Sequence, residues 1–428
     1  MINYCEVYLW GKRIGIVGYS GNDDVASFEY DEEFIKSGIE LAPIAMPLSN
    51  QVYSFRSLNK DTFKGLPGML ADSLPDRYGD ALINAWLSKQ NRTLDSFSPI
   101  ERLCYMGNRG MGALEYVPYN GPVDNNEEKL DIEKMLELAS QILTNRKDLN
   151  IDANSMTMAS LLKFGTSAGG ARAKAIIAFN EKTGDICSGQ IANKNDYGYW
   201  IIKFDGVYNN GDHNERDVND YTRIEYAYYL MAKAAGINMN ECRLLEENNR
   251  YHFMTKRFDR QEKTGEKVHM QTLGAIGHYD YNVPRSCSYE KASQICTLLN
   301  IGNDEVCELY RRMVFNVLSF NNDDHVKNIS FLMNKEGKWS LAPAYDLSFS
   351  YKADSIWVSR HQMTVNGKSE NITYDDMLMC AQNMNIKETK AKKIIEEVKI
   401  AVNKWEDFAN EAMVGKESKE TIKNIIVL

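Results

Sequence analysis

The 428-residue sequence lacks several features that would assign a function class directly. Its eight cysteines include no Cys-x-x-Cys pair, so we expect reduced, buried thiols in place of a metal site or disulfides. No apolar run approaches the roughly 20 residues of a membrane span, and the opening MINYCEVYLWGKRIGIVGYS has no continuous apolar signal core. The formal charge of −9 is spread without a basic stripe, which argues against direct nucleic-acid binding and favours a basic partner. The sequence therefore predicts a cytoplasmic protein that does not bind a membrane.

A P-loop with the order Gly-x-x-x-x-Gly-Lys-Ser/Thr is also absent. In its place, GTSAGGARAKA at residues 165–175 lies between two apolar runs that are typical of strands. Glycines between strands let backbone amides approach phosphate oxygens, and Ser167, Arg172 and Lys174 add polar and cationic groups. An ordinary hairpin turn explains the same glycines. By itself this segment leaves both interpretations open.

The composition is that of a globular protein, with 43% hydrophobic and 25% charged residues in a chain long enough for two or three domains. Alternating apolar residues on either side of Gly11-Lys12 predict a hairpin in a β-rich first domain. The turn-rich, acidic YNGPVDNNEE predicts a linker after it, and strands with one helix follow. The fold class is therefore α+β, with a first domain at residues 1–122, a strand-rich part at 123–260 and a mostly helical part at 261–428, whose expected helices cover 289–299, 304–320 and 388–413.

The most specific pattern lies in residues 316–347, which read NVLSFNNDDHVKNISFLMNKEGKWSLAPAYDL. Asp323 and Asn328 stand five residues apart, and Asp346 follows a predicted hairpin. Protein kinases use Asp-x-x-x-x-Asn to place a catalytic base and a metal-binding amide in one loop, and a later aspartate binds the second metal. Asp324 competes with Asp323 for the role of the base, and the spacing to Asn328 favours Asp323.

A lysine near the end of an apolar run adds a further kinase-like feature. Lys203 ends YWIIK at residues 199–203, where a kinase has the strand lysine that pairs with nucleotide phosphates. The commoner fate of such a lysine is an edge position with its ammonium group in water. The run at residues 251–260 predicts a later strand that leads into a nucleotide-binding hinge.

Together these segments resemble HipA-type serine/threonine kinases, the toxin components of bacterial HipBA toxin–antitoxin modules. The resemblance implies a HipA-type N-terminal domain at residues 1–122, followed by a bilobal kinase-like core. In that core, residues 123–260 are the N-lobe and residues 261–428 the helical C-lobe. It is carried by six motifs in order: GLPGMLADSLPDRYGDALI at 65–83, GTSAGGARAKA at 165–175, WIIKFDG at 200–206, KRFDR at 256–260, NNDDHVKNISF at 321–331 and LAPAYDLS at 341–348.

The resemblance also implies roles for individual residues. Asp323 is expected to be catalytic, and Asn328 and Asp346 to hold Mg²⁺. Ser167 matches the serine that this family autophosphorylates, which expels the loop and silences the kinase. The residues expected to bind ATP come from the glycine-rich segment, the strand lysine, the hinge and the catalytic loop: Ser167, Ala168, Gly169, Gly170, Ala171, Arg172, Lys174, Lys203, Lys256, Phe258, His325 and Lys327.

The cofactors implied are ATP and Mg²⁺, and the implied partner is a small DNA-binding HipB-like antitoxin, through which alone the chain would contact DNA. The implied substrate is a protein, typically an aminoacyl-tRNA synthetase. One departure is that some relatives carry Gln-Glu-Asp after the hinge strand, whereas residues 269–273 read HMQTL, without acids. The alternatives are a kinase of a small molecule and a pseudokinase that acts as a binding module in a repressor complex. A binding module has no need of Lys203, Asp323, Asn328 and Asp346 together.

Overall fold

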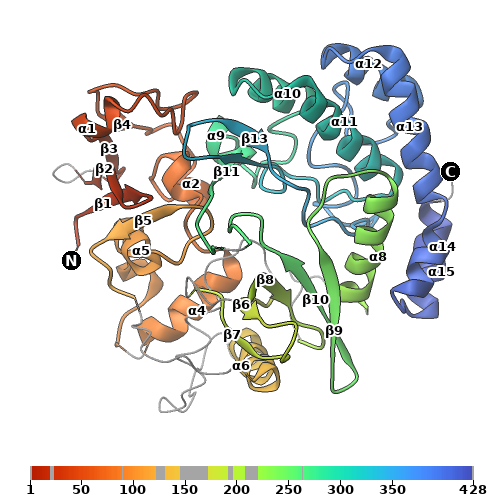
Figure 1. Cartoon of the computed structure of the whole chain (residues 1–428), viewed down its shortest axis with the longest axis horizontal. Coiled ribbons are helices and arrows are strands. Elements are labelled where there is room, and N and C mark those ends of the chain that lie inside the picture. Colours follow the sequence, from red (N-terminus) through yellow and green to blue (C-terminus); the bar gives the residue numbers. More distant parts are fainter. Residues whose placement is uncertain are drawn as a thin grey trace. The chain divides into compact units, whose positions relative to one another are not determined.

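The computed structural model describes residues 2–19, 24–88, 90–121, 131–144, 172–190, 196–207, 220–262 and 264–426 (Figure 1). The chain divides into two compact units. The first unit comprises Met1–Leu41, Leu48–Asp217 and Leu245–Met270, and the second comprises Ala42–Pro47, Val218–Leu244 and Gln271–Leu428. The predicted boundary near residue 122 falls at the edge of a described range and stays a prediction.

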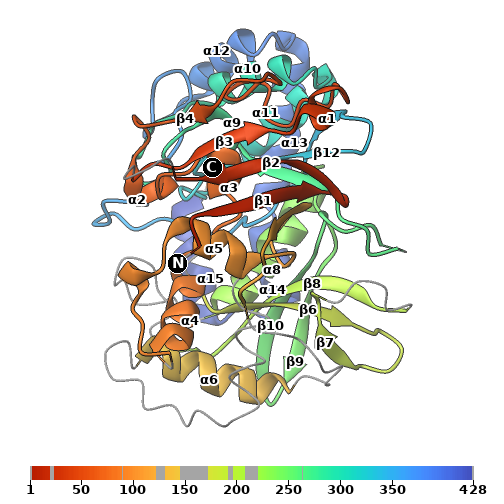
Figure 2. The ribbon, with the colours of Figure 1, turned by 90° about the vertical axis from the view of Figure 1, so that its left-hand side faces the viewer.

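The first unit begins with a five-stranded antiparallel sheet in the order β4-β3-β2-β1-β5 (Figure 2). The predicted hairpin is confirmed, because β1 and β2 are joined by Trp10 and Gly11, both with positive φ, as a tight two-residue turn requires. Helix α5 begins at a capping box in which Ser98 and Glu101 bond each other's backbone N–H groups. The elements are β1 (Tyr4–Leu9), β2 (Lys12–Gly18), β3 (Ser27–Tyr30), α1 (Glu32–Ile35), β4 (Tyr53–Ser54), α2 (Lys60–Phe63), α3 (Gly68–Ala71), α4 (Arg77–Ser88), α5 (Pro99–Met106) and β5 (Leu114–Val117).

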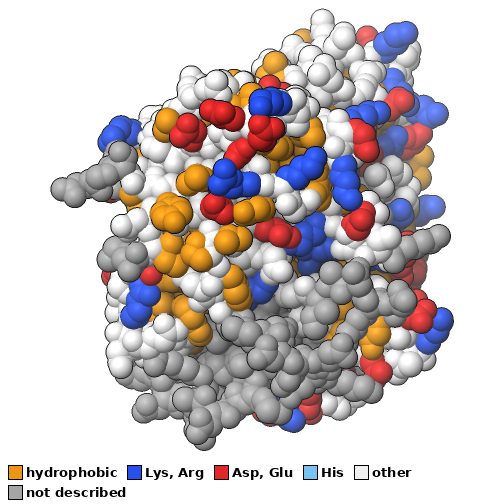
Figure 3. Space-filling view, turned by 60° about the vertical axis from the view of Figure 1, so that its left-hand side comes forward, with side chains coloured by type: hydrophobic (Ala, Val, Ile, Leu, Met, Phe, Trp, Pro, Cys, Tyr) orange, Lys and Arg blue, Asp and Glu red, His pale blue; other side chains and the backbone are white. Residues whose placement is uncertain are grey.

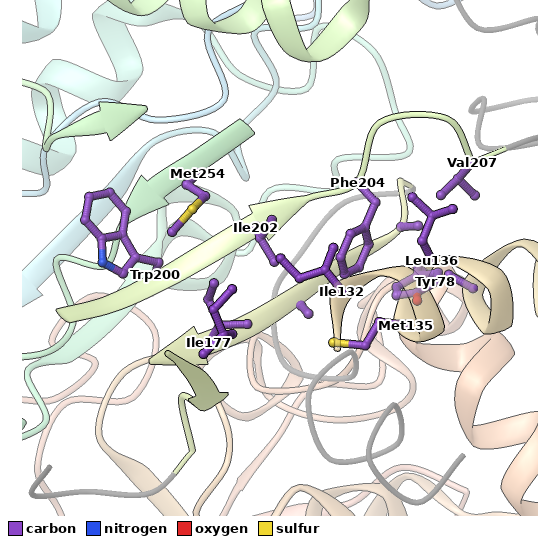
Figure 4. Packing of buried hydrophobic residues seen from close by; sticks show 14 of the residues in the cluster. Tyr78, Ile132, Met135, Leu136, Ile177, Trp200, Ile202, Phe204, Val207 and Met254 are labelled. Atoms are coloured by element: carbon purple, nitrogen blue, oxygen red, sulfur yellow. The ribbon is translucent and has the colours of Figure 1, made fainter. Parts of the chain in front are cut away.

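A second sheet has the strand order β7-β6-β8-β10-β9. Its register places Ile177 opposite Trp200, and the side chains on this face pack with α4 and α6 in one apolar core (Figure 4). The strands predicted at residues 176–179 and 199–204 are thus confirmed as β6 and β8, whereas the apolar run at 161–164, before the glycine-rich segment, lies outside the described residues. The elements are α6 (Ile132–Thr144), β6 (Lys174–Phe179), β7 (Ile186–Ser188), β8 (Gly198–Lys203), β9 (Cys242–Glu247) and β10 (Arg250–Lys256); the division between the units falls within β9.

The second unit is mostly helical, and in it α11 packs on α13 (Figure 1). The helices expected at residues 289–299 and 304–320 are confirmed as α10 and α11. The prediction of a single helix at 388–413 is wrong. The first helix ends before a turn at residues 403–404, and Trp405, which starts the next helix, is buried against Tyr228. The elements are α8 (Tyr221–Ala234), β11 (His269–Thr272), α9 (Leu273–Gly277), α10 (Tyr289–Leu298), α11 (Asn303–Leu318), β12 (Ser330–Met333), β13 (Trp339–Leu341), α12 (Tyr374–Asn383), α13 (Glu388–Val402), α14 (Trp405–Glu411) and α15 (Lys416–Ile426); the division between the units also falls within β11.

The α+β class is therefore confirmed. No helix among the described residues combines the length and the apolar character that crossing a membrane requires. On the face drawn in Figure 3, lysine and arginine side chains are interspersed with acidic ones and form no extended basic surface outside the grey atoms.

Candidate active site

The loop between α11 and β12 contains the predicted catalytic residues. The side-chain amide of Asn328 donates a hydrogen bond from Nδ2 to the backbone carbonyl of Asp323 at 2.8 Å. The backbone N–H of Asn328 also donates to the carbonyl of His325 at 2.8 Å. These two bonds close residues 323–328 into a compact turn. The structure thus brings together the two residues whose spacing predicted a catalytic loop.

The two adjacent acids of this loop lie in opposite environments. The Asp323 side chain is 49% exposed, whereas the Asp324 side chain is 1% exposed. Asp324 accepts hydrogen bonds from the Tyr289 hydroxyl and from the Gln362 backbone N–H, both at 2.8 Å. A carboxylate enclosed in this way has no access to a substrate hydroxyl. Of the two candidates for the base, the geometry favours Asp323.

His325 and Lys327 lie on the same turn. The Lys327 backbone N–H donates to His325 Nδ1 at 3.3 Å, which places the ring proton of a neutral His325 on Nε2. That Nε2 atom is 4.0 Å from Asp323 Oδ1, longer than a hydrogen bond. The Lys327 ammonium lies over the ring of Tyr281, 4.6 Å from its centre. The His325 ring thus lies near Asp323, and ATP binding by His325 or Lys327 stays a prediction.

Asp346 follows the β12–β13 hairpin, as predicted. Its φ of 57° lies in the left-handed region, which few residues other than glycine, asparagine and aspartate adopt, and which is frequent at functional sites. The Tyr345 hydroxyl donates to the Lys327 carbonyl at 2.6 Å, and the Ser350 backbone N–H donates to the Phe320 carbonyl at 3.0 Å. The segment that carries Asp346 is therefore bonded to both ends of the catalytic loop.

The donor set of this region suits Mg²⁺. Because Asn328 Nδ2 donates to the backbone carbonyl of Asp323, the amide oxygen of Asn328 is the atom that can bind a metal. Asp346 supplies a carboxylate. Hard oxygen atoms of these two kinds are the ligands that Mg²⁺ prefers. A cavity of about 20 Å³ is lined by Asn328, Asn321 and Tyr345 among others. It has room for about one water molecule and none for a nucleotide.

In the first unit, Lys203 ends β8 and lies between two neighbouring strands. Its cross-strand partners are Lys174 of β6 and Phe253 of β10, and its ammonium group is 5.8 Å from the centre of the Phe253 ring. Residues directly opposite one another share a face of the sheet, so the two lysines lie side by side. Lys174 is buried, with its Nζ 3.3 Å from Asp76 Oδ2. If Lys174 bound an ATP phosphate, its ammonium group would interact with that phosphate and with the Asp76 carboxylate at the same time.

The hinge residues predicted to bind adenine through their backbones lie at and beyond the end of β10. Lys256 pairs with Trp200 across the sheet, and its ammonium is bonded to Glu262. Phe258 is half-buried just after the strand. Five further predicted residues, Ser167, Ala168, Gly169, Gly170 and Ala171, lie outside the described residues, and Arg172 begins the next described range.

Sequence reasoning missed the role of the charged residues around Phe258. Asp259 is fully buried and accepts from Arg257 at 2.7 and 2.8 Å, from Arg260 at 2.8 Å and from the Gly112 backbone N–H at 2.7 Å. Burial by itself would raise the pKa of Asp259, but the two guanidinium charges and these hydrogen bonds hold that pKa well below its ordinary value. Burial and the charge of Arg257 lower the pKa of Arg260 to about 10. The KRFDR motif thus connects the end of β10 to the loop before β5 through hydrogen bonds.

Comparison with known proteins decides the family. A model of the HipA-like C-terminal domain matches residues 166–405, and a model of the HipA N-terminal domain matches residues 5–117. The chain belongs to the HipA family. The resemblance inferred from the six motifs is confirmed, and residues 166–405 of this HipA-family chain include Asp323, Asn328 and Asp346.

Two solved structures were compared with this chain, and one of them shares its fold. The HipA of Shewanella oneidensis MR-1, described in a complex of HipA, HipB and operator DNA, is 16% identical to this chain. The match covers 99% of this chain and 94% of that one with a TM-score of 0.68, which shows a common fold. The Helicobacter pylori proinflammatory kinase CtkA is 13% identical over 55% of this chain and 90% of that one. Its TM-score of 0.34 is too low to bear on the fold.

Proposed function

We propose that this HipA-family chain is an ATP- and Mg²⁺-dependent serine/threonine protein kinase. The observation that carries the proposal is the turn at residues 323–328. It presents a half-exposed carboxylate and is closed by the amide of Asn328. Phosphoryl transfer demands alignment and neutralisation of charge more than a strong base, and a positioned acid in a rigid turn meets the first demand.

Each of the other site residues has a part in this proposal. Asp323 orients the acceptor hydroxyl and takes its proton, while Asn328 and Asp346 hold Mg²⁺, which, when bound, neutralises charge on the phosphates. Lys203 neutralises phosphate oxygens from the end of β8. The neighbouring Lys174 is already partly neutralised by Asp76, which lowers the repulsion that two adjacent lysines would otherwise exert on each other.

The proposed partner is a HipB-like DNA-binding antitoxin, with DNA contacted only through that complex. Membership of the HipA family and the S. oneidensis complex of HipA, HipB and operator DNA support this proposal. The net charge of −9 and the interspersed charges of Figure 3 are in keeping with a chain that leaves DNA to its partner. The proposed substrate is a protein such as an aminoacyl-tRNA synthetase.

Autophosphorylation at Ser167 is proposed as an off switch. A phosphate at this position adds a charge of roughly −1.5 to −2 at pH 7, and it would compete with nucleotide phosphates for the amides and cations of residues 165–175. Mass spectrometry of the chain after incubation with ATP and Mg²⁺ checks the modification. An active enzyme without phosphate at Ser167 would contradict this switch and leave the kinase proposal intact.

The kinase proposal is tested with γ-labelled ATP, with and without Mg²⁺, in the presence of bacterial lysate proteins. Label should appear on protein, should require Mg²⁺, and should be at least about 100-fold weaker with a parallel preparation of Asp323→Asn, which controls for contaminating kinases. Label found only on a small molecule would identify the small-molecule kinase. A folded chain that binds ATP and transfers no label would be a pseudokinase, and either result overturns the proposal.

A further inference from the structure

Asp324, the enclosed neighbour of Asp323, is bonded through both carboxylate oxygens. Its Oδ1 accepts from the backbone N–H groups of Gln362 at 2.8 Å and, more weakly, of Met363 at 3.5 Å. Its Oδ2 accepts from the Tyr289 hydroxyl at 2.8 Å and lies 3.1 Å from His361 Nδ1. An ionised carboxylate can only accept, so the contact with His361 is a hydrogen bond when Nδ1 carries the proton.

On one side, this network reaches the helices that support the loop. Asn316 of α11 donates from Nδ2 to the Tyr289 hydroxyl at 2.9 Å, and Asn321 donates from Nδ2 to Asn316 Oδ1 at 2.9 Å. The chain of bonds therefore runs from Asn321 through Asn316 and Tyr289 to Asp324. All four side chains are buried, where hydrogen-bonded polar networks are rigid.

On the other side, the network reaches a segment more than 30 residues further along the chain. Gln362 and His361 contact Asp324, and Asn322 donates from Nδ2 to the Val358 carbonyl at 3.0 Å. The Gln362 carbonyl in turn accepts from the Arg285 backbone N–H at 2.7 Å. Residues 358–363 are thus hydrogen-bonded to the catalytic loop on both sides of Asp323, at Asn322 and at Asp324.

We propose that Asp324 is a positioning residue, which fixes the catalytic loop between α10, α11 and residues 358–363 and so holds Asp323 in its half-exposed orientation. This inference rests on the kinase activity proposed above. Asp323 shares a peptide bond with Asp324, so its backbone cannot rotate freely while the four contacts of Asp324 persist. A misplacement of about 1 Å can slow an enzymatic step about 100-fold. Loss of the Asp324 contacts therefore slows phosphoryl transfer, while Lys203, Lys256 and the other nucleotide-binding groups outside this loop stay in place.

The test measures the rate constant of label transfer from γ-labelled ATP at saturating ATP and Mg²⁺, divided by the number of nucleotide-binding sites from equilibrium binding of ATP. Asp324→Asn is expected to lower this rate constant about 10- to 100-fold with an unchanged Kd for ATP and Mg²⁺. Tyr289→Phe removes one of the bonds and should cause a smaller decrease. The matched control is Asp354→Asn, which changes an acid whose side chain is 80% exposed, and it should keep the wild-type rate.

The count of binding sites separates positioning from mere support of the fold. A structural role reduces the number of folded, nucleotide-binding molecules and leaves the rate per site unchanged, so a wild-type rate per site in Asp324→Asn overturns the inference. If that variant fails to fold, Tyr289→Phe and His361→Ala take its place, and wild-type rates in both overturn it. A wild-type chain that transfers no phosphoryl group overturns the proposed function itself, which is a distinct result.

Discussion

Two acidic regions of this chain use aspartate in opposite ways. In the first unit, Asp259 is enclosed by two guanidinium groups and a backbone N–H, so its charge is neutralised inside the protein. In the second unit, Asp323 projects half-exposed from a turn that Asn328 closes. Both lie in motifs that are equally polar in sequence. Their partners in the folded chain distinguish a carboxylate that stabilises the fold from one that is placed for chemistry.

The difference predicts separate consequences for stability and activity. Removing one partner of a buried ion cluster leaves the other charges buried without compensation, and such changes strongly destabilise a protein. Removing a half-exposed carboxylate has little effect on stability, and it removes a reactive group. A variant at Asp259 should therefore lose mainly stability, and a variant at Asp323 should lose mainly activity.

The largest expected effect is on activity at Asp323. Asp323→Asn keeps the shape of the side chain and cannot take up the hydroxyl proton, so the rate of phosphoryl transfer should fall by about 10²- to 10⁴-fold. The free energy of unfolding should change by no more than about 0.5 kcal/mol. Transfer assays and denaturant unfolding of the same preparations measure both quantities. Near-normal turnover in Asp323→Asn, together with inactivity in Asp324→Asn, would reverse the assignment of the base.

The next effect is on stability at Asp259. Asp259→Ala leaves Arg257 and Arg260 buried beside each other without their shared counter-ion, and should lower the free energy of unfolding by about 3–5 kcal/mol. Asp354→Ala, at an exposed acid, should change it by less than about 0.5 kcal/mol. Chemical denaturation of the two variants gives the comparison. Equal stabilities would mean that the buried cluster contributes nothing beyond an ordinary surface acid.

Sequence patterns predicted the parts of the fold and site whose signals are local. The hairpin at Gly11, the strands that end at Lys203 and Lys256, and the spacing of Asp323 to Asn328 all depend on neighbouring residues. The contacts that were missed include several between residues far apart along the chain. Gly112 lies 147 residues before Asp259, and Asp76 lies 98 residues before Lys174. No local periodicity encodes such pairs, because they form only when separate elements pack together.

The same limit applies at two further places. Asp323 and Asp324 are indistinguishable by type, and their different burial depends on Tyr289 and Gln362, each more than 30 residues away. The helix expected at residues 388–413 has sustained helical spacing. It is broken before Trp405, whose indole Nε1 donates to the Lys419 carbonyl and whose ring packs on Tyr228. Tertiary contacts overrode the local preference for one long helix.

Lowering the pH should affect the stabilising contribution of three histidines before it affects that of Asp259. Burial lowers the pKa of His252 and His278 to about 4 and of His269 to about 3, so unfolding takes up a proton at each. Their stabilising contribution is complete above about pH 6.5 and falls as the pH drops toward 4, by about 2 kcal/mol for each at pH 5. The contribution of Asp259, whose pKa is lowered, is lost only below about pH 4.

Denaturant unfolding at pH 7 and pH 5 measures this acid sensitivity. His252 accepts the Asp205 backbone N–H at Nδ1, 3.0 Å away, and His252→Asn keeps an acceptor there without a group that titrates near neutrality. The variant should lose about 2 kcal/mol less than the wild-type chain between the two pH values. An identical loss in both proteins would exclude His252 as a source of the acid sensitivity.

The smallest effect expected is at Asp346, where a charge placed for chemistry should affect ligand binding alone. A ligand at 100 times its Kd stabilises a protein by about 2.7 kcal/mol, and a tenfold loss of affinity reduces this to about 1.4 kcal/mol. Asp346→Ala should therefore lose about half of the stabilisation that ATP with Mg²⁺ provides. Because alanine is strained at a φ of 57°, Asp346→Asn is the matched variant, since asparagine tolerates this conformation. Each variant is compared with and without ligand, which cancels any strain in the unliganded chain. If ATP with Mg²⁺ stabilises both variants as much as the wild-type chain, Asp346 is not a metal ligand, and its left-handed backbone serves only the turn after β13.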